Sequence, residues 1–173
     1  FTLFGQFLLY YITLRLHFFS DNPLISNTPI ALSLLLAVIA NLIYLSIKNK
    51  SELYGGIALI LALITASVSD TTHFMLSLAV VVSAGAVYFF FHFGWRRTLI
   101  ISLFGVYLTF GLWLMKNQEL LNPLAFHQLH RICNLYLLLS AMTFSFITLV
   151  PPKEIFSRNF IFGAILLNGM NFS

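Results

Sequence analysis

Long apolar stretches separated by short polar gaps run along this whole chain, and most of its basic residues gather in alternate gaps. Three gaps hold a basic pair each: Lys48 with Lys50, Arg96 with Arg97, and Lys153 with Arg158. Of the gaps between them, one holds no lysine or arginine and the other holds only the widely separated Lys116 and Arg131. Because cytoplasmic loops of membrane proteins carry an excess of lysine and arginine, this alternation predicts a polytopic membrane protein.

The composition excludes an ordinary soluble domain. Of the 173 residues, 60% are hydrophobic and only 8% are charged, whereas soluble domains average about 25% charged residues. The net charge of +4 follows from paired basic residues in loops, so it does not indicate a nucleic-acid partner. The partners we expect are the lipid bilayer and other membrane subunits. A single cysteine, Cys133, excludes an internal disulfide.

The apolar stretches are too long for strands and do not alternate as barrel strands do, so they are predicted to be helices. We expect an all-α transmembrane bundle of up-down topology, with six full spans and a truncated seventh, in which residues 1–173 form a single transmembrane region of a longer membrane protein. The expected spans are Phe1–Phe19, Pro29–Ile47, Leu53–Ser69, Phe74–Phe93, Thr98–Met115, Ile132–Val150 and a run that begins near Phe160.

The charge pattern also predicts an orientation. If the gap after the second span is cytoplasmic, that side holds six basic residues, and the other side holds two, or three with Arg15. The N-terminal end of the chain then faces the cytoplasm, and we expect the protein to lie in the inner membrane. The connection that precedes the sixth span lies outside. In that connection Pro123 begins a helical turn that either lies in the interface or extends the sixth helix.

Several candidate residues are expected at the membrane interface. Arg15 is close enough to the end of the first span to reach the head groups with its charge. His127 and His130 are three residues apart, a spacing that places two metal ligands on one helix face. Cys133 returns only loosely to that face and no carboxylate completes a ligand set, so we interpret His127, His130 and Arg131 as interfacial residues. We expect no metal and no cofactor.

Polar side chains inside the predicted spans allow two interpretations. Asn41, Thr65, Ser67 and Asn134 would line a substrate path if they face a shared cavity. Side chains of this kind also form hydrogen bonds between packed helices, worth about 0.6 kcal/mol each. All five carboxylates lie at span ends or in loops, which argues against a proton-coupled transporter.

The sequence holds no phosphate loop, nucleophile elbow, HExxH motif or dinucleotide fingerprint. We therefore expect a structural or accessory subunit of a membrane assembly rather than an enzyme. A segment of a transporter or channel is the alternative. A weaker alternative is a membrane enzyme that acts on lipid-linked substrates through His127, His130 and Arg131.

The order of several short segments resembles a family of bacterial multi-pass membrane proteins named domain of unknown function 2339. An Ala/Leu-rich span ends in a basic turn, a Gly-containing span and a Ser-rich loop follow, and then come a small-residue cluster and two Trp-containing elements. The segments are Ile30–Lys48, Leu53–Leu59, Ser67–Asp70, Ser83–Ala86, Gly94–Arg97, Phe110–Trp113 and Leu166–Phe172. The resemblance implies a longer protein with many spans, and it implies no established activity.

Overall fold

The computed structural model describes residues 2–18, 27–69, 71–118, 123–148 and 158–172. The described residues form seven α-helices and one short 3-10 turn, so the predicted all-α class is confirmed. The helices are α1 (Thr2–Phe18), α2 (Thr28–Asn49), α3 (Glu52–Val68), α4 (Thr72–Phe93), α5 (Arg96–Gln118), α6 (Pro123–Ser145) and α7 (Arg158–Phe172), and the 3-10 turn η1 is Phe146–Thr148.

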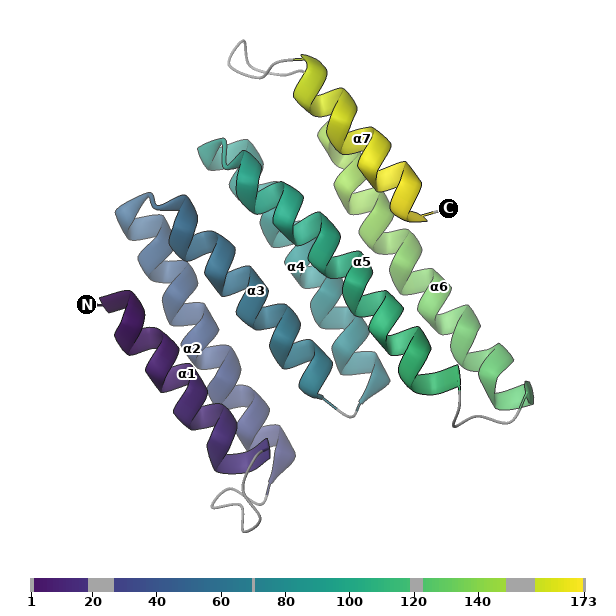
Figure 1. Ribbon diagram of the computed structural model, residues 1–173, viewed down its shortest axis with the longest axis horizontal. Helices are drawn as coiled ribbons and strands as arrows, with labels where there is room; N and C mark the ends of the chain where they lie inside the picture. The colour runs from purple at the N-terminus through teal and green to yellow at the C-terminus, as the bar shows by residue number, and fades with distance from the viewer. Residues whose placement is uncertain (1, 19–26, 70, 119–122, 149–157, 173) are drawn as a thin grey trace.

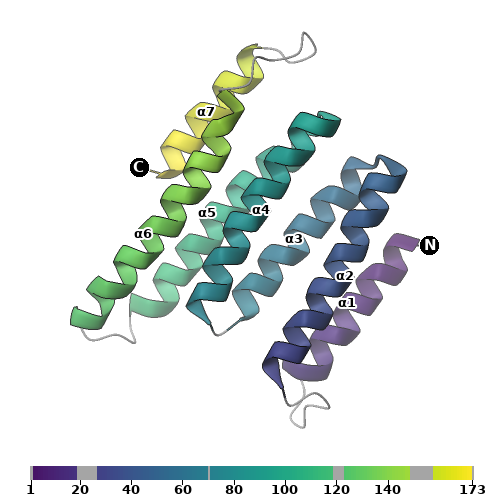
Figure 2. The same cartoon turned by 180° about the vertical axis from the view of Figure 1, so that it is seen from behind.

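The helices form two layers through which the chain passes back and forth. Figures 1 and 2 show α1, α3, α5 and α7 in one layer and α2, α4 and α6 in the other, with successive helices antiparallel. Each helix packs against the next along the chain, and α3 also packs against α5, α4 against α6, and α5 against α7. The up-down arrangement places the α2–α3 turn and the α4–α5 turn at the same end of the bundle, opposite the α3–α4 turn.

Apolar side chains fill the space between the layers and also cover the outside. Leu35, Leu76, Leu99 and Val106 are fully buried between helices. Many large apolar side chains face outward, among them Leu108, which is 63% exposed. An exposed apolar surface of this extent suits a bilayer rather than water, because lipid covers it at no cost.

The number of full spans differs from the prediction. Three helical stretches are long and apolar enough to cross a membrane, namely α2, α4 and Arg96–Met115 of α5. The helices α1 and α3 are apolar but have 17 residues each. At about 1.5 Å per residue such a helix measures about 25 Å, which is less than the roughly 30 Å of hydrocarbon in a bilayer. By this measure the described residues have three full-length spans rather than six.

The sixth helix also starts earlier than its apolar stretch. We expected a span at Ile132–Val150 and a helical turn at Pro123 that either lies in the interface or extends the helix. In the structure α6 is one continuous helix from Pro123 to Ser145, so the turn is an extension of the helix. Proline suits the first helical position, because the missing N–H has no partner within the helix there.

Candidate functional site

Two turns with basic residues meet at one end of the bundle. Lys48 and Lys50 belong to the α2–α3 turn, and Arg96 and Arg97 begin α5 directly after the α4–α5 turn. Two of the three basic pairs found in the sequence therefore lie at the same end, which we call the basic end. In the third pair, Lys153 lies outside the described residues and Arg158 is the first residue of α7.

The α2–α3 turn closes tightly around Lys50. The Ser51 N–H donates to Ser46 O at 3.1 Å and the Lys50 N–H donates to Ile47 O at 3.3 Å, which is the hydrogen-bond pattern of a Schellman cap. Lys50 has φ 48°, a left-handed conformation that glycine usually occupies at this position because a Cβ is unfavourable there. The turn therefore brings Glu52, the first residue of α3, within a few residues of the end of α2.

The Glu52 carboxylate caps the N-terminus of α5. Its Oε1 accepts hydrogen bonds from Arg97 N at 2.8 Å and from Thr98 N at 3.1 Å, and Thr98 Oγ1 donates to Glu52 O at 3.3 Å. These N–H groups have no partner within their own helix, and the helix dipole favours a negative charge at this place. Because Trp95, the residue before α5, has no side-chain acceptor, a carboxylate from a neighbouring helix takes the capping role.

Close packing of a glycine against a tryptophan holds the two turns together. Trp95 is buried, and its ring stacks on Phe93 with centroids 4.7 Å apart. A Cβ placed on Gly55 would lie 2.6 Å from Trp95 Cζ3 and 2.9 Å from Ser46 Oγ. Only glycine fits between these groups, so Gly55 allows the α3 backbone to contact the indole directly.

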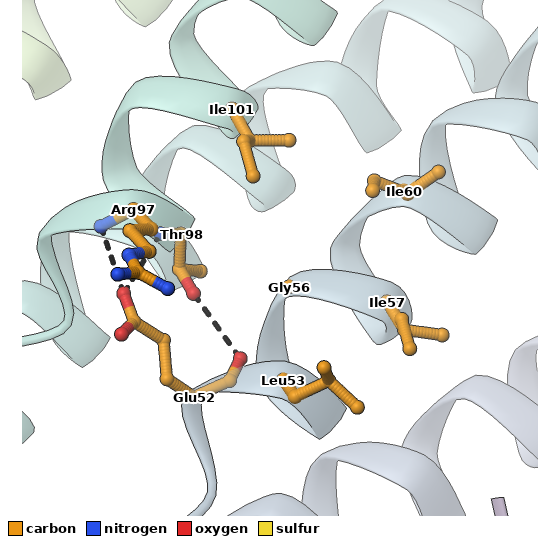
Figure 3. A pocket seen from close by; sticks show the side chains of 8 residues that line it. All are labelled: Glu52, Leu53, Gly56, Ile57, Ile60, Arg97, Thr98 and Ile101. Carbon is orange, nitrogen blue, oxygen red and sulfur yellow. Dashed lines mark hydrogen bonds between the residues drawn. The ribbon is translucent and has the colours of Figure 1, made fainter.

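A cavity of about 360 Å³ lies beside these contacts, between α3 and α5. Figure 3 shows the charged side chains of Glu52 and Arg97 at one end of it. Its remaining lining is Leu53, Gly56, Ile57, Ile60, Thr98 and Ile101. The volume lies in the range of small-molecule sites, which is roughly 300–1,000 Å³. The cavity is therefore polar at the basic end and apolar along the helices.

A second groove, of about 480 Å³, lies between α4 and the end of α6. Its lining includes Val87, Phe91, Leu139 and Met142 and contains no charged residue. The polar end therefore distinguishes the α3–α5 cavity, which we take as the candidate site.

The four polar residues predicted to line a substrate path do not come together. Thr65 is buried, with Oγ1 2.8 Å from Leu61 O and 2.9 Å from the Tyr10 hydroxyl of α1. Ser67 donates to Leu63 O of its own helix at 3.0 Å. Asn41 on α2 and Asn134 on α6 are exposed, and none of the four lines either cavity.

The predicted interfacial residues belong to α1 and α6. They lie at or near the end of the bundle that is opposite the basic end. Arg15 is exposed in the last turn of α1, and Arg131 is exposed in the first half of α6. His127 and His130 belong to the first turns of α6, and their side chains lie outside the described residues. Among the side chains that are described, no group of three metal-ligating residues occurs.

Two hydrogen-bonded contacts link Asn168 of α7 to α5 and to α6. The Tyr107 hydroxyl of α5 donates to Asn168 Oδ1 of α7 at 2.6 Å. Asn168 Nδ2 in turn donates to Ala141 O at 3.2 Å and to Ser145 Oγ at 3.1 Å on α6. The amide of Asn168 inside an apolar stretch was the available signal, because a buried amide requires partners. Nothing local identified Glu52, whose capping partners are 45 and 46 residues away.

No family model, curated protein or solved structure matches this chain. The resemblance to the family named domain of unknown function 2339 therefore stays a prediction. The class of protein follows from the helices themselves. By the length and hydropathy of three of them, the chain is a multi-pass membrane protein.

Proposed function

We propose that this chain is an integral subunit with a structural or accessory role in a larger membrane assembly. The observation that carries the proposal is the use of polar groups within the bundle. Tyr10 with Thr65 and Tyr107 with Asn168 form hydrogen bonds between helices, whereas a transport path would turn such groups toward a shared cavity. The described interior is accordingly built to hold helices together.

The proposal includes that the shorter helices α3 and α1 also lie within the bilayer. The short helix α3 packs against α2, α4 and α5, each of which contains a stretch long enough to cross a membrane. A helix enclosed by three crossing helices lies at their depth, and the bundle can tilt or the bilayer can thin to match it. The helix α1 packs against α2 in the same way.

The proposed location is a bacterial inner membrane, with the basic end in the cytoplasm. Lys48, Lys50, Arg96 and Arg97 lie at this end, and the positive-inside bias places such residues on the cytoplasmic side. The chain enters α1 at the same end. The N-terminal end of α1 is therefore proposed to be cytoplasmic.

In-membrane photo-crosslinking tests the accessory role. A photoreactive residue placed at Leu108 on α5 or at Val81 on α4 probes one outward face of each layer, since both side chains are 63% exposed. The same residue at the buried Leu103 is the matched control. We expect a defined cross-linked protein from an outward position, with the same protein co-purifying in fixed stoichiometry after mild extraction. Cross-links to lipid alone and recovery of a lone monomer would contradict the proposal.

A further inference from the structure

Two opposite charges line one end of the α3–α5 cavity without pairing with each other. The Glu52 carboxylate makes its described hydrogen bonds through Oε1, to backbone N–H groups of α5. Within the described part of the chain, neither Oε2 nor the exposed Arg97 guanidinium has a hydrogen-bond or ion-pair partner. A carboxylate and a guanidinium are thus both available to a group that enters this end of the cavity (Figure 3).

The apolar part of the cavity extends from these charges along the helices. Leu53, Ile57 and Ile60 follow one another on α3, and Ile101 faces them from α5. From Glu52 to Ile60 the helix rises by roughly 12 Å at about 1.5 Å per residue. Leu53, Ile60 and Ile101 are also exposed on the outer surface, so the cavity opens toward the lipid.

We propose that this cavity binds a phospholipid whose head group carries both a phosphate and a primary ammonium. The phosphate contacts the Arg97 guanidinium, the ammonium donates to Glu52 Oε2, and one acyl chain lies along Ile57, Ile60 and Ile101. The planar guanidinium suits phosphate oxygens, and the ammonium supplies the N–H donors that a carboxylate accepts.

The charges at the polar end select among lipid head groups. A purely anionic head group would bring its charge next to the Glu52 carboxylate, which repels it. A quaternary ammonium has no N–H to donate, so it cannot form the hydrogen bond to Oε2. The primary ammonium is the group that complements both side chains. This inference goes beyond the accessory role and requires only that the basic end lies at a membrane surface.

Native mass spectrometry of the detergent-purified chain with added lipids tests the proposal. Three phospholipids with identical acyl chains serve as probes, with ethanolamine, choline or glycerol head groups. We expect the ethanolamine lipid to be retained most tightly, and Arg97→Gln to weaken its binding about tenfold, the loss of one charge-assisted hydrogen bond. Lys48→Gln removes a charge at the same end outside the cavity and should leave binding unchanged. Equal retention of the three lipids, preference for the glycerol lipid, or no effect of Arg97→Gln would overturn the proposal.

A steric pair of variants tests the position of the acyl chain. Ile101→Trp fills the apolar part of the cavity, and Leu108→Trp adds the same side chain two turns further along α5, at an exposed position outside it. We expect Ile101→Trp alone to abolish retention of the ethanolamine lipid. Thermal unfolding of both variants, unchanged from the original chain, shows that the loss is local. Retention by Ile101→Trp equal to that by Leu108→Trp would contradict the assigned cavity.

Discussion

Replacing Gly55 by alanine tests the contact that joins the two basic turns. The added Cβ would lie 2.6 Å from Trp95 Cζ3, about 1 Å inside the usual carbon–carbon separation of roughly 3.5–4.0 Å. The indole has little room to withdraw, because it is buried and stacks on Phe93. Overpacking of this kind costs about 1–3 kcal/mol, and the better helix propensity of alanine returns up to about 1 kcal/mol. We expect a net destabilisation of about 1–2 kcal/mol.

The neighbouring Gly56 provides a matched control. A Cβ at Gly56 would lie 3.5 Å from Thr98 Oγ1, which is an ordinary contact, so Gly56→Ala should be neutral or slightly stabilising. Thermal unfolding in detergent can be followed with a fluorogenic maleimide, because the buried Cys133 becomes reactive on unfolding. We expect Gly55→Ala to lower the Tm by about 2–8 °C and Gly56→Ala not to lower it. Equal Tm values for the two variants would refute the reasoning.

Substitutions at four further positions probe the caps and the contacts between helices by the same unfolding assay. Lys50→Gly should stabilise the chain by about 1 kcal/mol, because it relieves the left-handed conformation, and Lys50→Ala, which keeps the Cβ, should not. Glu52→Gln should lower stability by about 1 kcal/mol, and added salt should reduce the difference between the two proteins, whereas a salt-independent loss would contradict an electrostatic cap. Asn168→Ala should cost about 1–2 kcal/mol through its three hydrogen bonds, and Tyr107→Phe about 0.6 kcal/mol through one. Equal losses for Asn168→Ala and Tyr107→Phe would show that the bonds to α6 contribute nothing.

Hydrophobicity and charge allowed much of the fold to be predicted. Each expected span overlaps a helix, because a long apolar stretch in lipid must satisfy its own backbone hydrogen bonds. The alternation of the basic pairs correctly predicted that Lys48 and Arg97 lie at the same end of the bundle. Two successive antiparallel helices return the chain to the side from which it started. The early start of α6 at Pro123 suits proline at the first helical position, but the sequence left open whether this turn lies in the interface or extends the helix.

The candidate site could not be predicted, because its contacts join residues far apart in the chain. From the sequence, Glu52 is an ordinary acidic residue in the first turn of α3. Its role as the cap of α5 depends on where α5 begins in space. Gly55 and Gly56 are equivalent in the sequence, and only the position of Trp95 distinguishes them. The count of full spans failed for a different reason. For α1 and α3, hydropathy identified an apolar stretch, but their 17 residues are shorter than the hydrocarbon of a bilayer.

Cysteine accessibility tests the membrane topology most directly. In a Cys133→Ala background, Asn49→Cys places a thiol at the basic end, and Thr71→Cys places one in the turn at the opposite end; both positions are exposed. A membrane-impermeant maleimide is added to right-side-out spheroplasts and to inverted vesicles. We predict that Asn49→Cys reacts only in inverted vesicles and Thr71→Cys only in spheroplasts. Reaction of both thiols from the same side would contradict a bundle that crosses the membrane, and reaction with the sides exchanged would contradict the cytoplasmic placement of the basic end.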